Sequence, residues 1–207
     1  RYNFYSVYAD KPYIDLRLGM KYLLTDDRYI NFAVGNYHQF IGTIQDDFNP
    51  PILDNWLAVD ESVDPASAIQ IVLGYEEYFQ DVYRVQIETY YKDIKNMLTY
   101  EEFRASTDAE VSSGKIRDTF TPSDGYAYGL ELFGQKTLGK LTGWIAYTYS
   151  VSRKMMNSIY TESEEEYYTN WDRAHAVSVL GNYMKNEKWE LNIKWAWQSG
   201  QAYTPIL

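Results

Sequence analysis

The sequence predicts an all-β protein in which about eight long antiparallel strands form part of a transmembrane β-barrel. Three patterns support this prediction. Long runs alternate apolar with polar or small residues, each run is about twice the ~5–6 residues of a globular strand, and tight turns alternate with long connections. Because neighbouring side chains of a strand point to opposite faces, each run has one face suited to lipid and one suited to water.

The clearest example is the stretch 125–152, which predicts two strands joined by a tight turn at 137–140. One of its faces is apolar and rich in tyrosine, and it carries Tyr126, Tyr128, Leu130 and Leu132, then Leu141, Ile145, Tyr147, Tyr149 and Val151. The intervening positions are mostly small or polar. We therefore expect lipid on the first face and a wet interior on the second.

Three further hairpins are expected on the same grounds. They comprise strands 13–24 and 30–39 with a turn at 25–28, strands 66–78 and 82–98 with a turn at 79–81, and strands 173–184 and 188–200 with a turn at 185–187. The apolar face of strand 173–184 stays open, because Val177 and Val179 compete with Ala176 and Leu180.

The connections between these hairpins are long, at 43–65, 101–123 and 155–171. Prolines at Asn49-Pro50-Pro51 and Asp64-Pro65 lead us to expect that the first connection cannot continue a strand ladder. Outer-membrane barrels have short periplasmic turns and long extracellular loops, whereas a soluble sandwich has no reason to sort loops by length. Residues 1–11 are expected to be the end of a strand or loop whose partner is missing, and both ends of the chain fall in mid-pattern, so we expect a fragment or a processed piece.

Composition excludes several classes of protein. The 207 residues carry a net charge of −10, which disfavours a general nucleic-acid binder because such proteins displace counterions with Lys and Arg. Cysteine is absent, so disulfides, cysteine-based zinc sites and thiol nucleophiles are excluded. The chain has no run of ~18 apolar residues and hence no predicted transmembrane helix. The aromatic content of 17%, with 22 tyrosines, favours strands and interfacial rings.

Charged residues of the predicted strands fall on the face opposite the apolar one. An Arg or Lys that faces lipid at the bilayer midplane costs roughly 2–4 kcal/mol. The predicted strands with clear alternation avoid this cost in their central parts. Glu190 shares this face with eight residues that are our candidates for contacts with a lumen or plug, namely Arg17, Lys21, Glu76, Arg84, Glu88, Lys92, Glu131 and Lys194. The alternative for each is a plain solvated position, on a soluble sheet or in a lumen.

The remaining polar residues predict neither catalysis nor a cofactor. The glutamates at 162–166 form a solvated loop or, alternatively, a divalent-cation site, although their spacing is not that of an EF-hand. His38 and His175 are the only histidines, which excludes a histidine-rich metal site. The nucleophile-elbow, Walker and dinucleotide motifs are absent. We expect no enzyme, no cofactor and no metal.

Several stretches resemble the barrel of TonB-dependent outer-membrane receptors of Gram-negative bacteria. They are Tyr13-Ile14-Asp15-Leu16-Arg17-Leu18-Gly19, Asn36-Tyr37-His38-Gln39-Phe40, Leu73-Gly74-Tyr75-Glu76, Glu88-Thr89-Tyr90-Tyr91-Lys92, Gly125-Tyr126-Ala127-Tyr128-Gly129-Leu130-Glu131-Leu132, Trp171-Asp172-Arg173-Ala174-His175 and Gln198-Ser199-Gly200-Gln201-Ala202-Tyr203-Thr204-Pro205. Asn36 and Ala202 depart from the residues usual in that family. The segments span nearly the whole chain and follow the family's order.

The resemblance implies a nutrient-import receptor in the bacterial outer membrane. Its barrel has about 22 strands and a plugged lumen, so residues 1–207 would be one domain that forms part of the wall, with the plug, the TonB box and the closing strands absent. Implied partners are membrane lipid and lipopolysaccharide, the protein's own plug, the TonB energy-coupling complex and a surface lipoprotein. Candidates for ligand contacts at the outer loops are Tyr37, His38, Gln39 and Arg173.

Two alternatives stay open at this point. A passive or structural outer-membrane barrel, such as a porin, an adhesin or an assembly component, would keep the wall without active transport. A soluble β-sandwich that serves as a binding module is the third possibility. The substrate, whether iron chelate, cobalamin, glycan or peptide, cannot be predicted from these residues.

Overall fold

The computed structural model describes residues 2–3, 12–44, 55–100, 120–157, 164–169 and 171–201, and in these ranges the protein is all-β. The strands are mutually antiparallel wherever they pair. Within the same ranges there is no helix that is long and apolar enough to cross a membrane.

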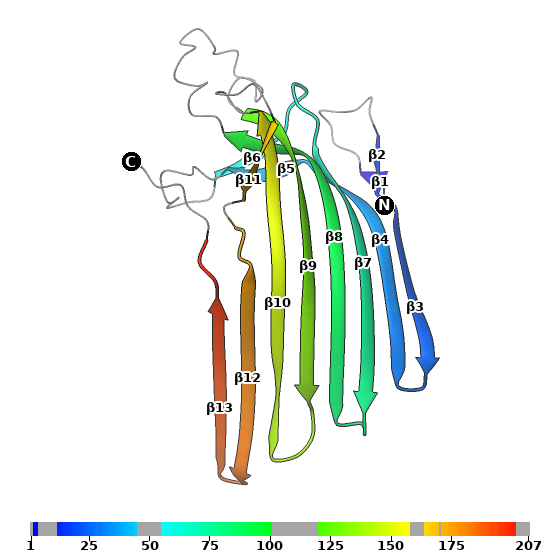
Figure 1. The fold of residues 1–207 in the computed structure, drawn as a ribbon, viewed down its shortest axis with the longest axis vertical. Coiled ribbons are helices and arrows are strands. Elements are labelled where there is room, and N and C mark those ends of the chain that lie inside the picture. Colours follow the sequence, from blue (N-terminus) through cyan, green and yellow to red (C-terminus); the bar gives the residue numbers. More distant parts are fainter. Residues whose placement is uncertain are drawn as a thin grey trace.

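Eight long strands form one open sheet (Figure 1). They are β3 (Arg17–Thr25), β4 (Arg28–Gln39), β7 (Ala66–Phe79), β8 (Tyr83–Tyr100), β9 (Phe120–Lys136), β10 (Leu141–Asn157), β12 (His175–Asn186) and β13 (Trp189–Gln198). Their spatial order is β13-β12-β10-β9-β8-β7-β4-β3, so each long strand pairs with the next one along the chain. The predicted four hairpins are confirmed.

Five short strands lie among the connections and correct three predictions. β1 (Tyr2–Asn3) pairs with β2 (Tyr13–Ile14), so part of 1–11 does have a partner in the chain. The predicted strand 13–24 is interrupted at 15–16, between β2 and β3. β5 (Ile41–Ile44) and β6 (Asn55–Ala58) form a hairpin inside the connection that was predicted to lack a ladder. The Asn49-Pro50-Pro51 segment lies outside the described residues.

The other two long connections also differ from their predicted bounds. β9 already begins at Phe120, and Pro122 pairs with Leu98 beyond an irregularity between Ile94 and Met97. Proline is tolerated in a ladder at such bulges, which explains why it does not end the strand here. In the third connection β11 (Glu164–Tyr168) returns along the end of β10, so part of the glutamate cluster is strand and not loop, while Glu162 lies outside the described residues.

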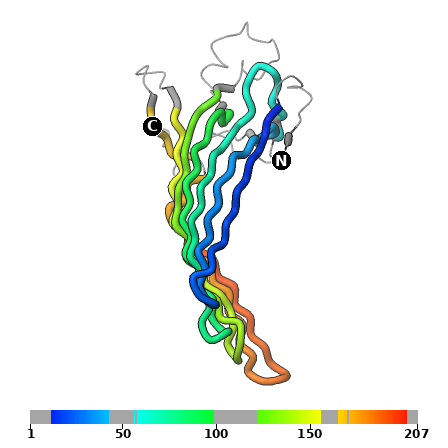
Figure 2. The backbone as a smooth tube through the Cα atoms, turned by 90° about the vertical axis from the view of Figure 1, so that its right-hand side faces the viewer, coloured from blue at the N-terminus to red at the C-terminus, as the bar shows by residue number. Residues whose placement is uncertain are grey.

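The tight turns all lie at one end of the sheet and the long connections at the other (Figure 1). In Figure 1 the tight turns step down from β3–β4 to β12–β13, and Figure 2 shows the strands as one bent layer in which that last hairpin reaches furthest. The turn between β7 and β8 has positive φ at both central residues, 53° at Gln80 and 57° at Asp81. The Val82 amide donates to the Phe79 carbonyl at 3.0 Å, which completes a hairpin turn of the primed type.

Strand register assigns every long strand to two faces. Residues that pair across antiparallel strands share a face, and one face gathers most of the large apolar side chains. Val177 and Val179 pair with Trp197 and Trp195, so they belong to this apolar face, and Leu180 belongs to the opposite one. The question that the sequence left open for strand 173–184 is thereby decided.

The apolar face is the more exposed of the two. Along β8 the residues Tyr83, Val85, Ile87 and Tyr91 are exposed, while the intervening polar residues are half-buried. The sheet therefore curves toward its polar face. Among the described residues the only buried hydrophobic side chains are Val59, Val63 and Val151, so this part of the chain has no conventional hydrophobic core.

Candidate functional site: the polar face

The polar face is the set of alternate strand positions opposite the apolar face. By register it holds all eight predicted lumen candidates, Arg17, Lys21, Glu76, Arg84, Glu88, Lys92, Glu131 and Lys194. Lys21, Glu88 and Glu131 even lie in one row across the sheet, linked by the pairs Lys21–Asn31, Asn31–Gly74, Gly74–Glu88 and Glu88–Glu131.

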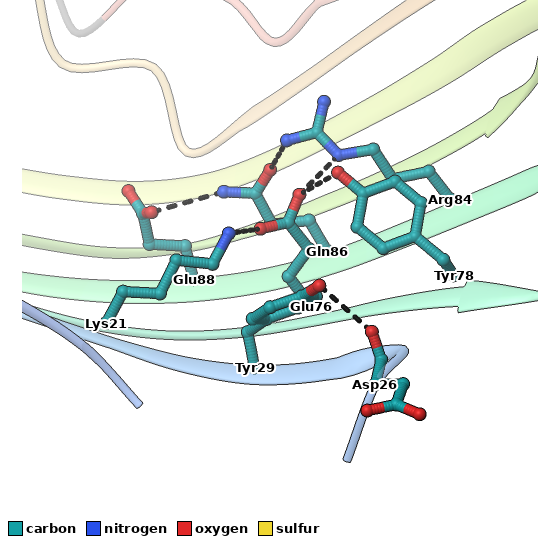
Figure 3. A network of polar contacts seen from close by, with 8 residues as sticks. All are labelled: Lys21, Asp26, Tyr29, Glu76, Tyr78, Arg84, Gln86 and Glu88. Atoms are coloured by element: carbon teal, nitrogen blue, oxygen red, sulfur yellow. Dashed lines mark hydrogen bonds and ion pairs between the residues drawn. The ribbon is translucent and has the colours of Figure 1, made fainter. Parts of the chain in front are cut away.

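Three of these candidates meet around one carboxylate (Figure 3). Glu76 Oε2 accepts a hydrogen bond from Lys21 Nζ at 3.0 Å, and Glu76 Oε1 accepts from Arg84 Nε at 2.7 Å. The Tyr78 hydroxyl donates to the same Oε1 at 2.8 Å. We call Lys21, Glu76, Tyr78 and Arg84 the Glu76 cluster.

The Glu76 cluster joins strands that are far apart in the sequence, since Lys21 lies on β3, Glu76 on β7 and Arg84 on β8. The Glu76 side chain is only 6% exposed, whereas that of Lys21 is 50% exposed. A carboxylate buried to this degree needs charged and hydrogen-bonding partners, and Glu76 has three. The cluster therefore fastens three strands together on the polar face, close to the tight turns.

Aromatic rings support the two cations of the cluster. Lys21 Nζ lies 4.0 Å from the centre of the Tyr29 ring, and Arg84 Cζ lies 5.5 Å from the centre of the Phe133 ring. Both distances are in the range of cation–π contacts. Tyr29 in turn donates its hydroxyl proton to the Asp26 carbonyl at 3.0 Å, which connects the cluster to the β3–β4 turn (Figure 3).

A second chain of contacts leads from the Glu76 cluster to two further carboxylates. Arg84 donates to Gln86 Oε1 at 3.0 Å, and Gln86 Nε2 donates to Glu88 Oε2 at 3.3 Å. Glu88 stands directly opposite Glu131 in the register, and both border a cavity of about 160 Å³ on the polar face. Two like charges in this arrangement repel each other, so the cavity favours water or a cationic group as its occupant.

The other lumen candidates lie apart from this cluster. Arg17 Cζ is 4.4 Å from the centre of the Tyr37 ring, and Lys92 Nζ is 5.6 Å from the centre of the Tyr90 ring. Lys194 is exposed on β13, at the edge of the sheet. The structure thus brings Lys21, Glu76 and Arg84 into contact and leaves the remaining candidates distributed along the same face.

The predicted outer-loop residues do not form a single site. Tyr37, His38 and Gln39 end β4, whereas Arg173 precedes β12, and β7, β8, β9 and β10 lie between those two strands. Five inter-strand spacings of ~4.8 Å separate them by roughly 24 Å. All four nevertheless lie at the end of the sheet that carries the long connections.

Their contacts at that end are mainly structural. His38 Nδ1 lies 2.8 Å from Asp15 Oδ1, and Gln39 Nε2 donates to the Ile41 carbonyl at 2.7 Å. The Arg173 carbonyl accepts from the Ser150 hydroxyl at 2.9 Å. Beside His38, burial raises the pKa of the Tyr13 hydroxyl, and Asp64 adds to that shift.

One acidic residue that organises this end, Asp172, was not among the residues predicted from the sequence. Asp172 Oδ1 accepts from the Ser152 amide at 2.7 Å, and Asp172 Oδ2 forms an ion pair with Arg153 Nη1 at 3.1 Å. Arg153 also lies over the Tyr168 ring, with Cζ 3.9 Å from its centre, and so holds β11 against β10. Asp172 stood in the Trp171–His175 segment, yet nothing in the sequence indicated its partners.

In the described part of the chain, no group of three or more His, Asp or Glu side chains could hold a metal ion. Two comparisons with known proteins were also negative. No protein-family model matches this chain, and no curated protein matches it. What the fold itself defines is an all-β antiparallel sheet with one apolar, exposed face and one polar, more enclosed face.

Proposed function

We propose that this chain is part of the barrel wall of a TonB-dependent receptor in the bacterial outer membrane, which binds a scarce nutrient at its outer loops and imports it. The observation that carries the proposal is the distribution of side chains between the two faces of the sheet, which is the reverse of that in a water-soluble protein. Large apolar side chains are exposed on one face, and charged side chains such as that of Glu76 are enclosed on the other. Water disfavours this arrangement, whereas hydrocarbon outside and a wet lumen inside favour it.

Aromatic residues on the apolar face support the same proposal. Tyr83 and Tyr91 on β8 flank the aliphatic residues Val85 and Ile87, and Trp189 and Trp195 on β13 flank Leu191 and Ile193 in the same way. Eight residues at ~3.4 Å each span about 27 Å along the strand, or about 20 Å along the normal at ~40° tilt. That height is close to the ~25 Å apolar band between the aromatic girdles of outer-membrane barrels.

The proposal gives each end of the sheet a role. The tight turns would face the periplasm, and the long connections with Tyr37, His38, Gln39 and Arg173 would face outward, where ligand arrives. The polar face would line a lumen filled by the plug. The partners are then the plug, lipopolysaccharide, the TonB complex and a surface lipoprotein, and the function requires no catalytic residue, resident metal or cofactor.

Site-directed spin labelling tests the orientation of the faces. Labels at Ile145 and Trp195 of the complete protein in lipid vesicles should be relaxed by oxygen, which dissolves in hydrocarbon. Labels at Glu88 and Lys194 should be relaxed by a water-soluble nickel chelate. The reverse pattern would exclude a membrane wall, and so would recovery of residues 1–207 alone as a stable soluble monomer.

A second experiment separates active import from a passive barrel. The complete protein should bind the purified periplasmic domain of TonB and should not conduct steadily in planar bilayers bathed in KCl. A steady KCl conductance without TonB binding would favour a porin-like protein instead.

A further inference from the structure

The apolar face carries a groove near the tight turns of β9–β10 and β12–β13. Gly134, Gly143 and Gly181 leave three neighbouring positions of this face without side chains, and Gly143 pairs directly with Gly181. Tyr83, Leu141 and Ile145 are the walls. The groove has a volume of about 390 Å³ and is broadly open on its outer side.

The backbone conformation keeps this groove open. Gly143 has a φ of +149°, which side chains rarely tolerate, and a Cβ there would collide with the Leu180 carbonyl oxygen. Gly181, in contrast, has open space where its Cβ would be, so a larger residue fits there without strain. The backbone conformation at Gly143 therefore keeps that part of the groove floor free of side chains. The depth of the groove depends on the absence of a side chain at Gly181.

A cation stands at the end of the groove nearest the turn. Lys136 is the last residue of β9 and one of the lining residues, and its Nζ lies 5.8 Å from the centre of the Tyr83 ring. Lys140 follows in the same tight turn. Arg84 also borders the groove, but its guanidinium is bound to Glu76 on the opposite face.

We propose that this groove binds one phospholipid, with an acyl chain laid over the three glycines and an anionic headgroup at Lys136. The proposal rests on the proposed membrane location, in which the tight turns lie at the periplasmic surface. An aliphatic chain matches the apolar walls, and the position of Lys136 at the level of Tyr83 matches the boundary where headgroups begin. The charge of Lys136 makes an anionic headgroup a better match than a zwitterionic one.

Native mass spectrometry of the complete protein measures the retained lipid directly. The protein is purified from membranes and exchanged into detergent that contains equal amounts of dioleoyl phosphatidylglycerol and dioleoyl phosphatidylethanolamine. We expect one lipid per protein, mainly phosphatidylglycerol. Gly181→Leu should lower its occupancy roughly tenfold, because the leucine takes the space of several methylenes. Lys136→Gln should retain a lipid but lower the preference for phosphatidylglycerol about fivefold.

Gly19→Leu controls for the added bulk alone, since Gly19 lies on the polar face of β3, far from the groove, and also has open space at its Cβ. Equal lipid occupancy in Gly181→Leu and Gly19→Leu would overturn the proposal. A dimer that Gly181→Leu dissociates would also overturn it, in favour of a second copy as the occupant. Recovery of each variant in the membrane fraction is measured separately. A variant that inserts but loses its lipid tests the groove alone. Failure of the unmodified protein to insert would instead contradict the proposed function.

Discussion

Replacement of Ile145 by arginine tests the two-faced sheet most directly. Ile145 lies on the apolar face of β10, two residues further from the tight turn than Gly143, is 53% exposed and pairs with Val179 on one side and Gly134 on the other. None of these neighbours can pair with a guanidinium. Arginine on the lipid face costs roughly 2–4 kcal/mol at the midplane and about 0–1 kcal/mol near the interface. At this intermediate depth Ile145→Arg should cost about 1–3 kcal/mol and lower the equilibrium constant for folding into vesicles by about 5- to 150-fold.

Ala146→Arg is the matched control, because it changes the next residue of the same strand on the opposite face. Ala146 borders the polar cavity that also contains Glu88 and Glu131, so an arginine there meets two carboxylates. We expect its free energy of folding to stay within about 1 kcal/mol of the unmodified value. Urea titration of the complete protein in vesicles, followed by tryptophan fluorescence, measures both variants. An Ile145→Arg cost equal to or below that of Ala146→Arg would refute the assignment of the faces.

Three further predictions concern local structure. Glu76→Gln should cost about 1–2 kcal/mol, because two cations lose their anionic partner while solvent screens part of the loss. Glu77→Gln should cost under ~1 kcal/mol, because it removes the charge from one outlying pair with Arg28 and weakens one hydrogen bond from the Tyr75 hydroxyl. Equal urea midpoints for the two variants would contradict the cluster. Replacing Gln80 by Asn together with Asp81 by Gly should raise the free energy of unfolding by about 1 kcal/mol, because both positions have positive φ and Asn-Gly favours that conformation. An unchanged urea midpoint would contradict the turn type. Asp172→Asn should speed amide exchange in 164–168 at least several-fold and leave the exchange of β7 and β8 unchanged, since it removes the carboxylate that pairs with Arg153, whose guanidinium lies over Tyr168 of β11. Unchanged protection of 164–168 would show that β11 does not depend on this pair.

The alternation of apolar and polar residues predicted the long strands well, because all apolar positions of one strand face the same surroundings. Tyr83, Val85 and Ile87 follow one another on one face of β8, and the polar residues Arg84 and Gln86 stand between them. The face of β12 could not be predicted in the same way, since both of its faces contain aliphatic residues. Only pairing with Trp195 and Trp197 of β13 decides that Val177 and Val179 belong to the apolar face.

The start of β9 was predicted too late for a different reason. A proline such as Pro122 normally argues against a strand. Here the irregularity between Ile94 and Met97 interrupts the regular pairing of β8 with β9 close to Pro122, and Asn96 within it has a φ of +57°. A bulge is a property of two strands together. The sequence of either strand alone therefore gives no sign that a proline will be accepted.

The same reasoning explains what could be predicted of the Glu76 cluster. The sequence placed Lys21, Glu76 and Arg84 on one face, because face depends only on the parity of each residue in its own strand. Contact depends also on register, and the register of β4 against β7 is fixed across a long connection by twelve paired positions, from Arg28–Glu77 to Gln39–Ala66. No local pattern encodes that offset.

The two edges of the sheet bear on whether the sheet closes into a barrel. β3 and β13 are the terminal strands of the sheet, so within the described residues each pairs on one side only. A backbone N–H or C=O left unpaired in hydrocarbon costs several kcal/mol, and the nine residues of β3 alone would present several. If the apolar face lies in a bilayer, as we propose, both edges must pair with further strands. The stepped tight turns fit that requirement, because strands that close into a barrel are staggered relative to one another (Figure 1).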